Sequence, residues 1–183
     1  MLMTVNNTPK TYLGKTTIVL NDVDIHITVR NIAMLLLLNI EDVEVSADVI
    51  THLWYSARLK PSHVSLLKTH VQSKIDQVVE QLKNVKGDAL QAKTFSIGKS
   101  TIRVILFKYQ WASLKNMLAK ILDPQTTEAS RKSIVVENKD EVDRVMYEIK
   151  SKLHRRRSAM HYREHGVLLP FGSCCEAFTA ANP

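Results

Sequence analysis

Glycine and proline are scarce in this chain, with five of each among 183 residues. Both are common in the tight turns that join the many short strands of β-sandwiches and barrels. Their scarcity argues against such folds and favours a helix-rich one. The length suits one domain with a real core. A hydrophobic content of 45% and a charged content of 23% are those of a globular protein, not a disordered one.

Cysteine is also rare, and the two cysteines are the neighbours Cys174 and Cys175. Adjacent cysteines lie too close together for ordinary disulfide geometry. Two cysteines alone do not complete a structural zinc site. This usage is typical of a reducing compartment, so we expect an intracellular protein of the cytoplasm or the nucleus.

Long apolar runs are absent. The longest covers residues 32–38, whereas a membrane-spanning helix needs about 20 apolar residues. Residues 1–14 are polar and lack the apolar centre of a secretory signal. We therefore expect a buried helix at residues 32–38 and no membrane partner.

The stretch around which the chain is organised begins at residue 16. Residues 1–15 predict a flexible lead-in, and residues 16–183 a single domain. Residues 16–20 are β-branched and apolar, which predicts a short strand buried on both faces. Asp24 is placed to cap a buried helix over residues 25–39. A strand, an acidic turn and a helix form half of a nucleotide-binding α/β unit.

Periodicity and turn residues predict the remaining elements. Helices are expected at 46–58, 61–85, 109–122, just after Asp123, and at 140–165 with Gly166 as its end. A hairpin is expected from 94–97 and 101–107, and 133–136 reads as a strand or an extended connection. The apolar tail at 167–173 is expected to dock on the body.

Asp22 and Asp24 are the candidate cofactor-binding residues. An acid at the end of a strand can accept hydrogen bonds from ribose hydroxyls, as in class I methyltransferases. However, only Gly14 lies upstream, so the glycine-rich turn that would cradle a cofactor is absent. We favour the simpler interpretation, in which the two acids cap a turn, and we expect no bound cofactor.

A basic patch near the C-terminus could bind phosphates, and the net charge of +7 is compatible with an anionic partner. Its residues are Lys150, Lys152, Arg155, Arg156, Arg157 and Arg163. Because residues 155–157 point in different directions on a helix, no single face gathers them. We favour a solvated helix end, with cations near the negative end of the helix dipole, over nucleic-acid binding.

No metal or catalytic motif is complete. His161 and His165 have a spacing that can bind zinc, but the residues between them do not follow the His-Glu-x-x-His order, and Arg163 would oppose a cation. No nucleophile elbow, phosphate-binding loop or kinase motif is present. We predict no metal site and no catalytic residue.

Several segments together resemble a known protein family. They are 19–24 with Arg30-Asn31 and Leu35-Leu36, 52–57 (His-Leu-Trp-Tyr-Ser-Ala), Trp111 after 101–104, and 166–172 (Gly-Val-Leu-Leu-Pro-Phe-Gly). From about Lys15 to Pro183 the chain resembles the domain of unknown function 4470. That domain is abundant in fungi, is often followed by a MYND zinc finger, and also forms the N-terminal part of the axonemal dynein assembly factor.

The resemblance implies a Rossmann-like, methyltransferase-type core with added helices, here truncated and helix-rich. Family members begin with a strand and a Gly-x-Gly-Asp-x-Arg turn, which this chain lacks. It therefore looks like an internal fragment, and S-adenosylmethionine is expected only in a full-length relative. We expect a non-catalytic module that binds or assembles a protein partner. The alternatives are a degenerate methyltransferase-like domain and nucleic-acid binding through the basic helix.

Overall fold

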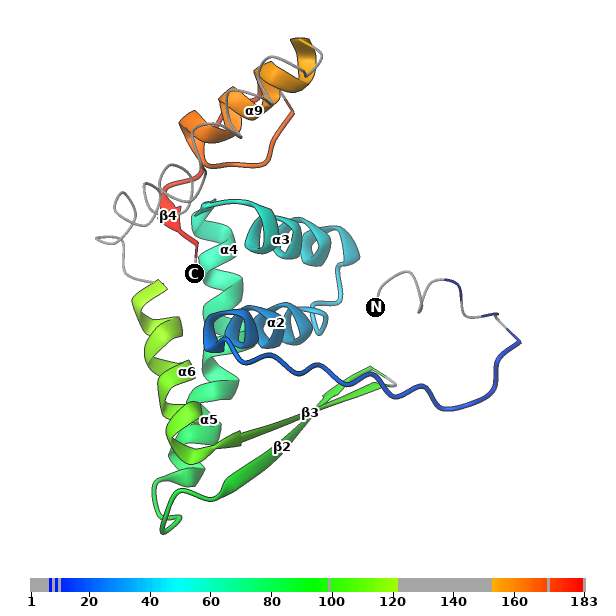
Figure 1. Cartoon of the computed structure of the whole chain (residues 1–183), viewed down its shortest axis with the longest axis vertical. Helices are drawn as coiled ribbons and strands as arrows, with labels where there is room; N and C mark the ends of the chain where they lie inside the picture. The colour runs from blue at the N-terminus through cyan, green and yellow to red at the C-terminus, as the bar shows by residue number, and fades with distance from the viewer. Residues whose placement is uncertain are drawn as a thin grey trace.

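The computed structural model describes residues 7, 9, 11–98, 100–121, 153–170 and 172–182. They form a helix-rich mixed α/β fold, as predicted (Figure 1). Its elements are α2 (Ile25–Leu37), α3 (Val43–Tyr55), β1 (Arg58–Leu59), α4 (Pro61–Leu67), η1 (Lys68–Gln72), α5 (Ser73–Leu82), β2 (Leu90–Ile97), β3 (Ser100–Phe107), α6 (Lys108–Ile121), α9 (Leu153–His165) and β4 (Ala180–Ala181). The elements predicted after Asp123 and at 133–136, and the first half of the helix predicted at 140–165, lie outside the described residues.

The strand predicted at residues 16–20 is wrong. Residues 12–23, here called the N-terminal segment, adopt neither helix nor strand. Figure 1 shows them as an extended stretch that leaves the body of the molecule. Val19 is 82% exposed and Val23 is fully exposed. A strand requires a hydrogen-bonded neighbour, and the described residues place none beside this segment.

Helix α2 begins as predicted. The carboxylate of Asp24 accepts a hydrogen bond from the backbone N–H of His26 at 2.8 Å, which satisfies one of the free donors of the first turn. The helix ends at Leu37, two residues before the predicted end. Its buried side chains, which point toward several sides, confirm a buried helix: Val29, Ile32, Ala33, Met34, Leu36 and Leu37.

Helix α3 begins earlier than predicted and also ends earlier. Asp42 is its cap, and the Asp42 carboxylate accepts from the backbone N–H groups of Glu44 and Val45 at 2.9 and 3.1 Å. Ser46, predicted to open the helix, instead lies inside it, where its buried hydroxyl donates to the Leu37 carbonyl at 3.2 Å. The cap is therefore the acid of the preceding loop, and the serine links α3 to α2.

The helix predicted at 61–85 is a helical run through α4, η1 and α5, and η1 is a π-helical turn. Leu67, Val71 and Ile75 are fully buried and lie four residues apart. On an ideal α-helix each step of four drifts by about 40° around the axis. A π turn holds more residues per turn, so it keeps this apolar row facing the core.

The predicted hairpin is confirmed and is longer than expected. Strands β2 and β3 pair antiparallel, with Ile97 opposite Ser100 and Leu90 opposite Phe107. The other pair, β1 with β4, is also antiparallel. Among the described residues no parallel strands occur, so the Rossmann-like core is not confirmed.

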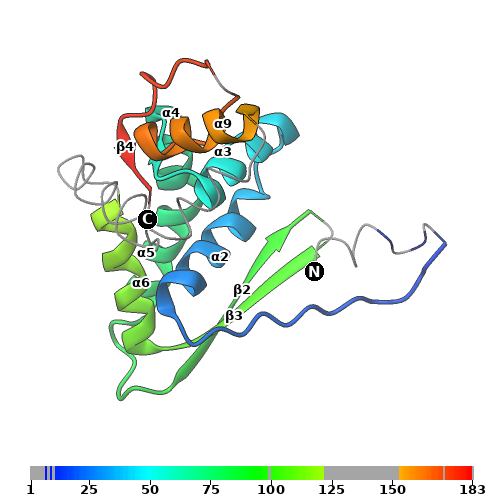
Figure 2. The ribbon, with the colours of Figure 1, turned by 45° about the horizontal axis from the view of Figure 1, so that its top comes forward.

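The hydrophobic core lies between α2, the α4–α5 run, α6 and one face of the hairpin (Figures 1 and 2). From α6, which matches the helix predicted at 109–122, it takes Trp111, Leu114 and Leu118. The Trp111 ring N–H donates to the Gln91 carbonyl at 3.2 Å. This bond satisfies the polar atom of a buried indole and fixes α6 against β2. No described helix is long and apolar enough to cross a bilayer.

The C-terminal tail, here residues 167–170 and 172–182, docks on the body. Within the part predicted to dock, residues 167–173, Val167 is buried and the Leu168 backbone N–H donates to the Ser56 hydroxyl at 2.9 Å. Helix α9 ends at His165, and Gly166 follows with a φ of 70°, the left-handed conformation that glycine adopts at helix ends. The tail then returns so that β4 pairs with β1. The side-chain amide of Asn182 donates to the carbonyls of His52 and Leu53 at 3.1 and 2.9 Å, and also to that of Ser56. The end of α3 is thus tied to residues about 130 positions later in the chain.

Candidate functional site

Asp22 and Asp24 lie together at the start of α2, and both are exposed. The Asp22 carboxylate accepts from the backbone N–H of Asp24 at 2.9 Å, and Asp24 caps the helix. One oxygen of each acid therefore accepts from the backbone N–H of the residue two positions further on. This is the turn-capping arrangement that the sequence favours; a cofactor role for the two acids stays an untested prediction.

The predicted basic patch is described only in part. Lys150 and Lys152 lie outside the described residues, as does the side chain of Arg156. Arg155 and Arg157 are exposed on α9, and Arg163 is half-buried in its last turn. Because Arg155 and Arg157 are two residues apart on a helix, they point about 200° apart around its axis. The two described arginines of the 155–157 run therefore do not share one face.

A polar network joins α3, the start of α4 and the tail. Asp48 lies at its centre: its carboxylate is 3.3 Å from His52 Nε2, 2.9 Å from His63 Nε2 and 3.2 Å from Lys60 Nζ. Both histidines are buried. Their rings stack with centroids 5.3 Å apart, and the Phe178 ring of the tail lies 4.7 Å from His52.

Ser56, His52 and Asp48 have the residue types of a hydrolase triad. His52 Nδ1 lies 2.9 Å from the Ser56 hydroxyl and its Nε2 faces Asp48. However, Ser56 is only 4% exposed, and its oxygen accepts from the backbone N–H of Leu168 at 2.9 Å. A nucleophile must reach substrate. The buried serine instead links α3 to the tail, so this network holds structure together.

The pKa values in this network follow from burial and charge. Burial lowers the pKa of His52 and of His63 below the ordinary value, and the nearby Asp48 opposes that effect without overcoming it. Burial raises the pKa of Asp48, but its hydrogen bonds to His63 and Lys60 and their charges outweigh this, so that pKa is lowered. The network thus favours neutral histidines and an ionised Asp48.

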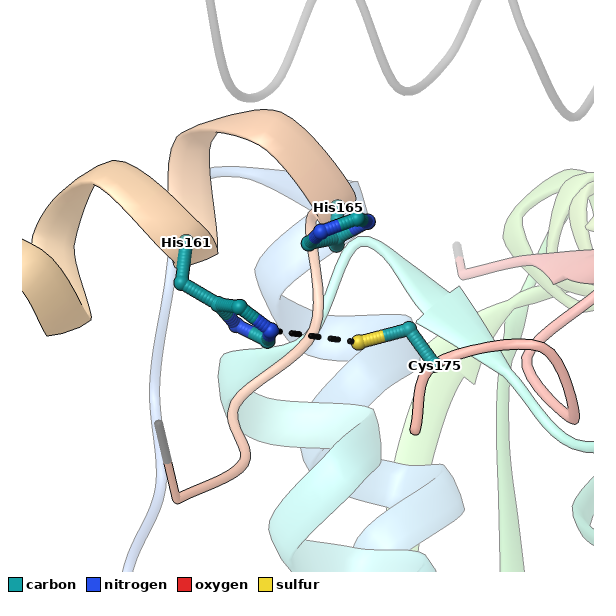
Figure 3. A group of neighbouring side chains, drawn as sticks. All are labelled: His161, His165 and Cys175. Atoms are coloured by element: carbon teal, nitrogen blue, oxygen red, sulfur yellow. Dashed lines mark hydrogen bonds between the residues drawn. The ribbon is translucent and has the colours of Figure 1, made fainter. Parts of the chain in front are cut away.

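A second cluster was missed by sequence reasoning. His161 and His165, one turn apart on α9, lie beside Cys175 of the tail (Figure 3). Cys175 Sγ is 3.8 Å from His161 Nε2, and the histidine ring centroids are 4.5 Å apart. One ligand atom of each residue lies within 4.8 Å of the others, and all three residues are half-buried.

The two histidines were visible in the sequence as an i,i+4 pair, but their partner was not. Cys175 reaches them because the chain reverses between α9 and the tail, with Gly172 at a φ of 84°. Burial and the neighbouring Cys174 raise the pKa of the Cys175 thiol, and Arg58 opposes this. A thiol kept protonated is a weak nucleophile, which argues against a catalytic role for Cys175.

Comparison with known protein families gives a match to part of the chain. The family model "Domain of unknown function (DUF4470)" matches residues 1–59, which include the N-terminal segment, α2, α3 and β1. The resemblance is thereby confirmed for this part of the chain; residues 60–183 lie outside the match. No curated protein and no solved structure matches the chain.

Proposed function

We propose that this chain is a non-catalytic protein-interaction module whose N-terminal segment adds as a strand to an open sheet edge of a partner protein. The observation that carries the proposal is the exposure of apolar side chains in that segment. Ile18 and Leu20 are about half exposed at 47% and 48%, and Val19 is exposed at 82%. Exposed apolar residues gathered in this way are typical of interaction sites.

The chemistry of the segment suits strand addition better than helix docking. Residues 16–20 are Thr-Thr-Ile-Val-Leu, and β-branched residues favour extended backbone. In an added strand the main chain supplies the hydrogen bonds, and alternate side chains fill pockets. Ile18 and Leu20 would then face one side of the partner's sheet and Val19 the other.

The net charge of the chain indicates the charge expected of the partner protein. The formal net charge is +7 at pH 7. Opposite charge speeds encounter and suppresses wrong partners more than it adds affinity. We therefore expect a partner protein with net negative charge.

The alternative functions have less support. A methyltransferase-like domain needs Asp22 for the ribose, but one of its oxygens already accepts from the Asp24 backbone. Nucleic-acid binding needs a gathered basic face, but Arg155 and Arg157 diverge around α9. Neither alternative accounts for the exposed Ile18, Val19 and Leu20.

Photo-crosslinking in cells tests the proposal. A p-benzoylphenylalanine at Val19 should form an adduct that mass spectrometry maps to an edge strand of one partner protein. The same probe at Asn39, an exposed residue after α2, is the control and should not form this adduct. With that partner added to the purified chain, hydrogen exchange should show the amides of residues 16–20 becoming protected.

The variant that pairs Ile18→Asp with Leu20→Asp should remove both the adduct and the protection, because buried charges are costly. Its own fold should be unchanged, since both side chains are about half exposed and lie outside the helices and strands. No adduct from Val19, an adduct on a helix, or an adduct on a second copy of this chain would each overturn the proposal.

A further inference from the structure

We propose that His161, His165 and Cys175 form a zinc-binding site between α9 and the C-terminal tail. The three side chains converge in Figure 3 although they come from two separate segments. The site is independent of the N-terminal segment, so it stands or falls separately from the proposed function.

The spacing of the ligand atoms fits tetrahedral coordination of a zinc ion. Zinc lies about 2.0–2.1 Å from histidine nitrogen and about 2.3 Å from cysteine sulfur, so the ligand atoms of two histidines and one cysteine in a tetrahedral site are about 3.3–3.6 Å apart. Cys175 Sγ and His161 Nε2 are 3.8 Å apart, close to the value for a nitrogen and a sulfur that share one zinc ion. The remaining separations are within 4.8 Å, which small rotations of the half-exposed rings can close.

The ligand types select the metal. A thiolate with two imidazoles is a soft to borderline donor set, which suits zinc and disfavours magnesium or calcium. Two histidines and one cysteine leave a fourth position, which water can occupy because all three ligands are half-exposed. Glu164 adds negative charge close by, with its carboxylate 3.8 Å from His165 Nε2.

The positive charge of Arg163 does not oppose a cation at this site. It lies two residues from each histidine, so on a helix it points about 200° away from both. From the sequence alone we expect this charge to oppose a cation. On the helix, however, the Arg163 side chain lies on the face opposite the two histidine ligands.

The ion would connect parts of the chain that meet at the end of α3. Beside the cluster, the Tyr162 hydroxyl donates to the Tyr55 carbonyl at 2.7 Å, and the Ala57 backbone N–H donates to the Gly166 carbonyl at 2.6 Å. Zinc held by α9 and by Cys175 would close the loop between them. Binding to the folded state alone raises stability by mass action.

Cobalt(II) titration of the purified full chain tests the site, because tetrahedral cobalt bound to thiolate gives visible d–d and near-ultraviolet charge-transfer bands. We expect these bands to saturate at one cobalt per chain and to disappear on addition of zinc. Zinc should also raise the midpoint of thermal unfolding. Absence of the bands in the wild-type chain would overturn the proposal.

Variants locate the ligands. Cys175→Ser should lose the charge-transfer band, and His161→Ala or His165→Ala should weaken cobalt binding at least tenfold. Cys174→Ser is the matched control, since this cysteine is adjacent and exposed; it should keep the band, as should His26→Ala on α2. Circular dichroism of each variant checks folding. A band that survives Cys175→Ser, or that is lost in Cys174→Ser alone, would show that the assignment is wrong.

Discussion

At the scale of single residues, Asp48, His52 and His63 make stability depend on pH. Folding lowers the pKa of both histidines from the ordinary value of 6.5. The unfolded chain therefore takes up protons first as the pH falls. The stability due to the neutral histidines is fully present above about pH 6.5 and is lost as the pH drops below it.

We predict that the urea midpoint of the wild-type chain is flat from pH 8 to 7 and decreases from pH 6.5 to 5. His63→Asn should reduce that decrease, because it removes one of the two groups that must be protonated. His26→Asn, a change at an exposed residue, serves as the control and should leave the profile unchanged. A wild-type midpoint that rises between pH 6.5 and 5 would contradict this account.

At the scale of elements, the caps determine where helices begin. Asp24 caps α2 and Asp42 caps α3, each accepting backbone N–H bonds of the first turn. We predict that Asp24→Ala and Asp42→Ala each lower the free energy of unfolding by about 1 kcal/mol, as loss of a helix cap does. Asp22→Ala should cost less, because Asp22 bonds to the Asp24 backbone and not to the first turn.

Urea unfolding measures the three variants, with Asn39→Ala, another exposed polar residue near a helix end, as the control. If Asp24→Ala left stability unchanged, the carboxylate would be free of a structural role. The cofactor interpretation of Asp22 and Asp24 would then gain weight.

The elements predicted correctly are those whose signals are local. A cap at Asp24, steps of three and four in residues 61–85, and Gly98 between two β-prone runs each act within a few residues. Residues 16–20 carry an equally local β signal, yet a strand also needs a partner from elsewhere in the chain. The local pattern holds no information on that partner, and the prediction failed there.

At the scale of the whole molecule, the decisive contacts join distant positions. Asn182 meets the end of α3, and Cys175 meets His161 only after the tail has turned back. Neither residue lies in a periodic run or a known motif, so sequence reasoning predicted that the tail docks without identifying how. The candidate metal site was missed for the same reason, since its third ligand is set by tertiary structure.

Asn182 joins the tail to the end of α3 by hydrogen bonds. It is 5% exposed, and its amide nitrogen, which carries two hydrogens, lies within hydrogen-bond reach of three carbonyls at the end of α3. We predict that Asn182→Ala lowers the free energy of unfolding by about 2 kcal/mol, because the Leu53 and Ser56 carbonyls lose the amide donor, whereas the His52 carbonyl keeps the Ser56 backbone N–H. Asn182→Asp should cost more, since a carboxylate cannot donate to those carbonyls.

The loss of stability in this variant should be concentrated in the tail and the end of α3. There β4 pairs with β1, and the Phe178 ring packs near His52 and His63. Hydrogen exchange of Asn182→Ala should therefore speed up at Leu59 and Ala180 while α5 and α6 keep their protection. Uniformly faster exchange would instead mean that the tail and the helical core unfold as one unit. In that case Asn182 would support the whole fold, because the pairing of β1 with β4 would share the stability of the core.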